Sequence, residues 1–180
     1  MPVTSEAAAL TAVLESYRAT WPVRNCDRSR VRSADELRDT SQHAQVSSLS
    51  VAPADPWAPG QPPSGGFGNG ERKFLWVVCA LNVPYAMEEG ELGATITGRG
   101  KLSHTNLTGG GTAHCGGELW FDSASKLWLT GGSGRYPPRS AAELEAVVRA
   151  LRAAGYDVIS AGWSEELGCP ARFFRVANLS

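Results

Sequence analysis

Several side chains in the second half of the chain are suited to acid–base chemistry. The candidate catalytic residues are His104, His114, Glu118 and Tyr136. A histidine changes charge near neutral pH, and a carboxylate or a phenol can exchange a proton with a reacting group. The guanidinium of Arg135 can stabilise a developing anion. This set predicts acid–base cleavage or transfer at a phosphodiester or glycosidic bond. The alternative is that each histidine is an ordinary polar residue on the surface.

A glycine-rich loop precedes the longest expected helix and forms the candidate ligand-binding segment. The candidate ligand-binding residues are Asn106, Gly131, Gly132, Gly134 and Arg135. Glycines permit positive φ and close approach of a ligand to backbone N–H groups, and a helix start nearby offers more such groups. The loop therefore predicts a phosphate or carboxylate site, although its arginines can also be merely solvated.

The glycine-rich loop does not match a nucleotide-cofactor motif. The lysine and the spacing of a Walker loop are absent, and two prolines separate the glycines from the helix, unlike the dinucleotide fingerprint. We expect no cofactor, and a small anionic ligand or nucleotide as the bound molecule.

The positions of the two glycine-rich loops predict that they meet. Residues 118–122 and 126–130 form the clearest hairpin, with Ser123, Ala124 and Ser125 as its turn. The loop 106–117 precedes the first strand, and the loop 131–139 follows the second. Because these two ends of an antiparallel hairpin are neighbours, the candidate residues should gather at one edge of the sheet. His104 and Asn106 join them if residues 101–105 form an adjacent strand.

The elements around the hairpin predict an α+β fold. Ser140 and Glu143 form a capping-box pattern at the start of a helix with an apolar stripe, and residues 156–159 suggest a strand that returns after it. Further strands are expected at 74–81, 94–97, 101–105 and 172–176. We expect a mixed, mostly antiparallel sheet with one long amphipathic helix packed on a face.

The chain divides by composition into three segments. Residues 1–46 are a helical N-terminal segment with an amphipathic helix at 5–17, residues 47–71 are a Pro/Gly-rich linker, and residues 72–180 are the α+β domain. We expect a fragment that begins at Arg72 to fold alone. An arginine cluster between Arg24 and Arg32 is interpreted as a solvated surface, with a basic patch for phosphates as the alternative.

Composition excludes several function classes. The net charge of −1 and the pI near 6.3 argue against nucleic acid as a partner. No apolar run approaches the ~20 residues that span a bilayer, so no membrane and a cytoplasmic location are expected. The four cysteines lack zinc spacing, so we expect no metal and free thiols.

Two functions stay open from the sequence alone. The first is an enzyme of the kind described above, with Cys115 and a histidine base as a second catalytic option. The second is a non-catalytic protein–protein interaction module, such as an inhibitor or immunity-type protein, with its tryptophans at the interface. His104-Thr105 followed by a tyrosine and a late glutamate resembles the His–Tyr–Glu pattern of ADP-ribosyltransferases. The resemblance covers scattered residues only, so no assignment is based on it.

Overall fold

A six-stranded sheet organises the computed structural model, which describes residues 6–49, 73–122 and 126–173. The strand order is β2-β4-β3-β6-β7-β8, and only the β7–β8 pair is parallel. The strands are β2 (Ser47–Ser48), β3 (Phe74–Val77), β4 (Pro84–Met87), β6 (Gly116–Phe121), β7 (Leu127–Thr130) and β8 (Val158–Ser160). The mixed α+β architecture predicted from the sequence is confirmed.

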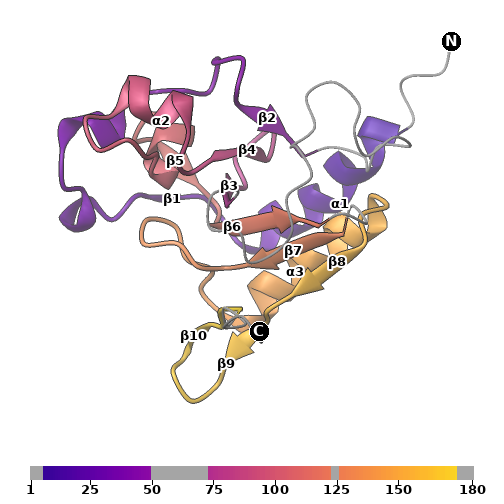
Figure 1. The fold of residues 1–180 in the computed structure, drawn as a ribbon. Coiled ribbons are helices and arrows are strands. Elements are labelled where there is room, and N and C mark those ends of the chain that lie inside the picture. The colour runs from indigo at the N-terminus through magenta and orange to yellow at the C-terminus, as the bar shows by residue number, and fades with distance from the viewer. Residues whose placement is uncertain (1–5, 50–72, 123–125, 174–180) are drawn as a thin grey trace, which may run out of the picture.

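Two helices cover one face of the sheet. In Figure 1, α1 (Glu6–Thr20) and α3 (Ala141–Ala153) lie together behind β6, β7 and β8. Side chains alternate along each strand, so Leu119 and Leu129 point toward the helices. The stripe of α3 that meets them is buried and consists of Leu144, Val147, Val148 and Leu151. The main hydrophobic core therefore lies between these helices and the sheet.

A layer of short elements covers part of the opposite face. Leu75 and Val77 of β3 pack there with Leu102, Leu107 and Tyr136. The elements of this layer are α2 (Glu91–Ile96), the short sheet of β1 (Arg24–Asn25) and β5 (Thr112–Ala113), and 3₁₀ helices at Arg28–Arg30, Ala34–Leu37 and His104–Leu107. The hairpin of β9 (Trp163–Ser164) and β10 (Cys169–Pro170) follows β8. This second layer positions the candidate site.

Three strand predictions differ from the structure. Residues 94–97 belong to or follow α2, because Leu92 and Ile96 lie four residues apart and both pack against the second core. Residues 101–105 contain a single bridge from Lys101 to Glu89 and then the turn of a 3₁₀ helix. Residues 172 and 173 are not in a strand, and 174–176 lie outside the described residues.

The N-terminal helix is part of the main core. Leu10, Leu14 and Tyr17 of α1 are buried against α3, whereas Val13 of the same helix is 37% exposed. The Tyr17 hydroxyl donates a hydrogen bond to Glu143 Oε1 over 2.9 Å. The division at residues 47 and 72 stays a prediction, and residues 50–72, including Trp57, lie outside the described part. No helix among the described residues is long and apolar enough to cross a membrane.

Candidate functional site

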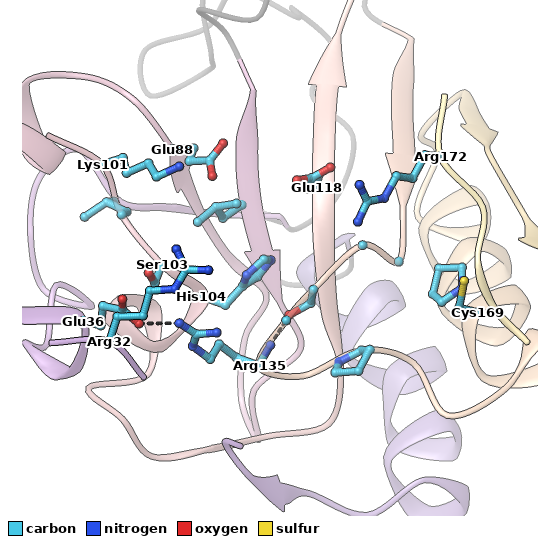
Figure 2. Close-up of a pocket in the computed structure, with 18 of the residues that line it drawn as sticks. Arg32, Glu36, Glu88, Lys101, Ser103, His104, Glu118, Arg135, Cys169 and Arg172 are labelled. Carbon is cyan, nitrogen blue, oxygen red and sulfur yellow. Dashed lines mark hydrogen bonds and ion pairs between the residues drawn. The ribbon is translucent and has the colours of Figure 1, made fainter. Parts of the chain in front are cut away.

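A pocket of about 390 Å³ opens beside the second face of the sheet. Its walls come from the N-terminal segment, strand β3 and the residue after β4, residues 99–104, strand β6 and the loop after β7. The C-terminal segment completes the lining with Cys169, Pro170 and Arg172. Figure 2 shows Glu36 and Arg135 at one end of the pocket, Glu118 toward the other and His104 between them in that view. The pocket therefore joins candidate residues that lie far apart in the sequence.

The two glycine-rich loops lie side by side, as the hairpin geometry predicted. The Gly116 amide donates to the Tyr136 carbonyl over 2.7 Å. A Cβ atom on Gly117 would lie 1.9 Å from the Thr130 carbonyl oxygen, so only glycine fits there. The glycines at the start of β6 thus allow β7 and the loop after it to pack closely.

The glycines of the second loop act by leaving space. None of Gly131, Gly132 and Gly134 has a positive φ, so the expectation that they permit a left-handed turn is wrong. A Cβ on Gly131 would lie 2.8 Å from Pro138 and 2.9 Å from Pro170. At Gly134 the nearest atom would be a nitrogen of Arg30 at 4.0 Å. The lack of a side chain at Gly131 therefore lets the loop pack against Pro138 and Pro170. The lack of one at Gly134 leaves space in the pocket.

The polar groups of this loop divide into those with and without partners. The Ser133 hydroxyl oxygen accepts hydrogen bonds from the amides of Arg135 and Tyr136. Within the described part of the chain, the amides of Ser133 and Gly134 have no hydrogen-bond partner. These two N–H groups are therefore available as backbone donors beside the pocket.

The start of α3 does not contribute to the pocket. Its Ser140 side chain accepts from the Glu143 amide, and the Glu143 carboxylate accepts from the backbone and side chain of Arg139. No residue of α3 lines the pocket. The expectation that a helix N-terminus supplies part of an anion site is corrected here, because the buried Glu143 already occupies this helix end.

A buried carboxylate holds two arginines at one end of the pocket. Glu36 is 0% exposed, and its two carboxylate oxygens accept from Arg99 and Arg135 separately. Burial alone would raise the pKa of Glu36, but the two guanidinium groups outweigh this effect and leave that pKa below its usual value. The buried Arg135 Nε has no hydrogen-bond partner among the described residues. Arg135 is therefore fixed in place with an N–H group still unpaired.

Positive charge exceeds negative charge around the pocket. Five cationic side chains and three carboxylates line it, and each carboxylate is already ion-paired. Arg32, Lys101 and Arg172 have no ion pair among the described residues. Sequence reasoning missed all three, together with Glu36, Arg99 and Glu88. Only the arginine cluster between residues 24 and 32 gave a signal, and it was interpreted as solvated surface.

His104 is a buried, neutral imidazole. Its Nε2 donates to the Gly117 carbonyl oxygen over 2.8 Å, which leaves the lone pair on Nδ1. Nδ1 has no partner among the described residues. Burial lowers the pKa of His104 from 6.5 to about 4. At neutral pH this side chain is therefore an acceptor rather than a cation.

Glu118 belongs to a three-residue ionic network. Lys73 Nζ lies 2.8 Å from Glu118 Oε1 and 2.6 Å from Glu88 Oε2. Burial alone would lower the pKa of Lys73, but its hydrogen bonds to both carboxylates outweigh this and raise that pKa. Glu118 Oε2 has no partner among the described residues. The carboxylate can therefore accept one further hydrogen bond from within the pocket.

Three predicted site residues lie elsewhere. His114 Nδ1 bonds to the Trp21 carbonyl oxygen over 2.6 Å, and its ring lies against Tyr17 of α1. Tyr136 is fully buried and donates to the Gly111 carbonyl oxygen over 2.7 Å. The Asn106 side chain bonds to the backbone of residues 35, 38 and 103. None of these three lines the pocket, and each side chain is occupied in holding loops together.

The buried His104 is expected to make stability depend on pH. Its pKa is lower in the folded chain than in the unfolded chain, so the unfolded chain binds a proton first as the pH falls. The folded protein therefore loses stability as the pH falls from the ordinary histidine pKa of 6.5 to the folded-state pKa of about 4. We expect the free energy of unfolding in urea to fall between pH 7 and pH 5, with His104 contributing about 2 kcal/mol of the drop.

His104→Gln is the matched variant for that titration. Glutamine can still donate to the Gly117 carbonyl oxygen but does not titrate. Its stability should fall by correspondingly less over the same pH interval. An equal fall in both proteins would show that His104 is not buried in its neutral form.

Comparisons with known proteins give no relative. No protein-family model, no curated protein and no solved structure matches the chain. Among the described residues, no cluster of histidine, cysteine, aspartate or glutamate side chains could hold a metal ion. Any function must therefore be argued from the pocket itself.

Proposed function

We propose that the protein binds a phosphate-bearing or nucleotide-like ligand in the pocket beside its second glycine-rich loop, and acts on it by acid–base chemistry at a phosphodiester or glycosidic bond. The first glycine-rich loop, residues 106–117, does not line this pocket, so the ligand is not placed between the two loops as the sequence suggested. The excess of cationic side chains around the pocket carries this proposal. Three of these cations, Arg32, Lys101 and Arg172, have no ion pair in the described structure and are exposed to solvent, so their positive charge attracts an anionic ligand that enters the pocket.

Each group in the pocket has a proposed role. Arg135 meets the phosphate through its free N–H groups, because a guanidinium can contact two phosphate oxygens at once. The amides of Ser133 and Gly134 add backbone donors. Glu118 is the proposed general base, and His104 orients the ligand through Nδ1 as a neutral acceptor. His114 and Tyr136 have no part in this proposal, because neither lines the pocket.

Binding is tested with Arg135→Lys. Lysine keeps the charge but loses the fork geometry, so the affinity for AMP and for inorganic phosphate should fall about tenfold in calorimetry. Arg149→Lys is the matched control, because Arg149 is exposed on α3 and remote from the pocket lining. Undiminished phosphate affinity in Arg135→Lys would remove this loop from the site.

Catalysis is tested with Glu118→Gln. The chromogenic probes are bis(p-nitrophenyl) phosphate and p-nitrophenyl glycosides, one for each proposed bond. Removing the general base should lower turnover of the active probe by about a hundredfold or more while leaving ligand binding measurable. Phosphate binding without turnover of either probe would contradict the catalytic part of the proposal.

The interaction-module alternative has little support in the described structure. Its exposed large apolar residues are Val13, Val23, Leu81 and Leu167. They lie on α1, on the segment after it and on two separate turns, and single exposed apolar residues are ordinary on protein surfaces. If no anionic probe binds the wild type, this alternative becomes the better interpretation.

A further inference from the structure

The pocket has two ends with different chemistry. Arg32, Glu36 and Arg135 gather at one end in Figure 2, and Glu118 lies at a distance from them. The first end offers donors and positive charge. The second also carries positive charge, from Lys101 and Arg172, but differs in offering two hydrogen-bond acceptors, since neither Glu118 Oε2 nor His104 Nδ1 has a partner among the described residues. A ligand that satisfies both ends must carry an anion on one side and donors on the other.

The cationic end is built for an oxyanion. Arg99 and Arg135 each contact the buried Glu36 through one Nη2 atom, so the carboxylate fixes both guanidinium groups and leaves their other N–H groups unused. One of these, the Arg135 Nε, is buried without a partner. Two cations around a single carboxylate keep a net positive charge, which a phosphate can neutralise.

The acceptor end favours neutral donors over a cation. Glu118 and Glu88 already share Lys73, and Lys101 and Arg172 line the same pocket without an ion pair. An ammonium group entering there would meet like charge on both sides. Hydroxyl groups meet no such repulsion and can donate to both the carboxylate and the imidazole.

We infer that the ligand is a phosphate ester of a polyhydroxylated group, with its phosphate on the N–H groups of Arg99 and Arg135 that Glu36 leaves free and its hydroxyls on Glu118 and His104. This inference rests on the proposed function and adds the class of ligand and its direction in the pocket. The volume of about 390 Å³ is consistent with it, because pockets of this size hold more than a bare phosphate ion.

The test compares ligands that differ at one end. Calorimetry on the full chain uses inorganic phosphate, ribose 5-phosphate, 2-deoxyribose 5-phosphate and phosphoethanolamine at one ionic strength. Ribose 5-phosphate should bind about tenfold more tightly than inorganic phosphate and phosphoethanolamine, with 2-deoxyribose 5-phosphate between them. A preference for phosphoethanolamine, or no preference for the sugar phosphates, would overturn the inference.

The variants assign each end of the ligand. Glu118→Gln should reduce the preference for ribose 5-phosphate to less than about threefold while inorganic phosphate binds at least as tightly as before. Arg135→Lys should weaken every phosphate probe alike. Glu145→Gln makes the same chemical change on an exposed face of α3 and should alter nothing. Circular dichroism melting shows that each variant is folded.

The outcomes separate this inference from the proposed function. If Arg135→Lys weakens all phosphate probes but the sugar adds no affinity, the phosphate site stands and the polyhydroxylated ligand is refuted. If Glu118→Gln leaves the sugar preference intact, the assigned direction is refuted. If no probe binds the wild type, the proposed function fails together with the inference.

Discussion

Replacement of Val148 by aspartate is expected to abolish cooperative folding. Val148 is 0% exposed on the face of α3 that meets the sheet. The change removes a buried apolar side chain, worth about 2 kcal/mol, and places a carboxylate where the core offers no cation. The combined cost is comparable to the roughly 5–15 kcal/mol that stabilises a typical domain. Near-ultraviolet circular dichroism and urea unfolding measure it.

Arg149→Ala is the matched control on the same helix. Arg149 is exposed and forms no ion pair among the described residues. The change should shift the free energy of unfolding by less than about 0.5 kcal/mol. Similar losses in Val148→Asp and Arg149→Ala would mean that the buried face of α3 has been assigned wrongly.

Short-range patterns in the sequence predicted the local structure of the second half of the chain. Ser140 accepts from the Glu143 amide, as the spacing of these residues indicates, and Leu119 pairs with Leu129 in the hairpin. The hairpin then placed the two glycine-rich loops together, because pairing of β6 with β7 leaves no other arrangement of their ends. These inferences succeeded because each depends on residues close in sequence.

The pocket could not be predicted because its key contacts are long-range. Glu36 and Arg135 are 99 positions apart, and no local pattern pairs one carboxylate with two particular arginines. Neighbouring side chains in the loop also point in different directions: Arg135 reaches Glu36, whereas Tyr136 enters the second core. The segment after α1 decided the place of His114, since its Nδ1 bonds to the Trp21 carbonyl oxygen, away from the pocket.

The N-terminal segment gives the second large expected effect. The sequence alone led us to expect that a fragment from Arg72 folds, but the core that the structure shows leads to the opposite expectation. Such a fragment loses Leu10, Leu14 and Tyr17, each of which contributes about 1.5–3 kcal/mol by burial. It also loses β2, the strand that pairs with β4 at the edge of the sheet.

The deletion also removes hydrogen bonds from the polar groups at the start of α3, although Glu143 and Arg139 keep their contacts with each other. Glu143 is fully buried and loses the Tyr17 hydroxyl, and the Arg139 guanidinium loses the Pro22 carbonyl oxygen. Loss of these two hydrogen bonds adds roughly 1–3 kcal/mol, so the total approaches the whole stability of a domain. We expect the fragment 72–180 to lack a cooperative thermal transition.

Two further variants serve as controls for the deletion of residues 1–71. Removal of only the residues before Glu6 should leave the thermal transition unchanged, because α1 begins at Glu6. Tyr17→Phe keeps the ring in the core but removes the hydrogen bond to Glu143, and it should cost about 1–3 kcal/mol while the chain stays folded. A fragment 72–180 that melts cooperatively would show that the core formed by α1 and α3 is dispensable. Even if it folds, this fragment lacks the pocket residues Arg32 and Glu36. A folded fragment that no longer binds phosphate would show that the N-terminal segment is needed for the site but not for folding.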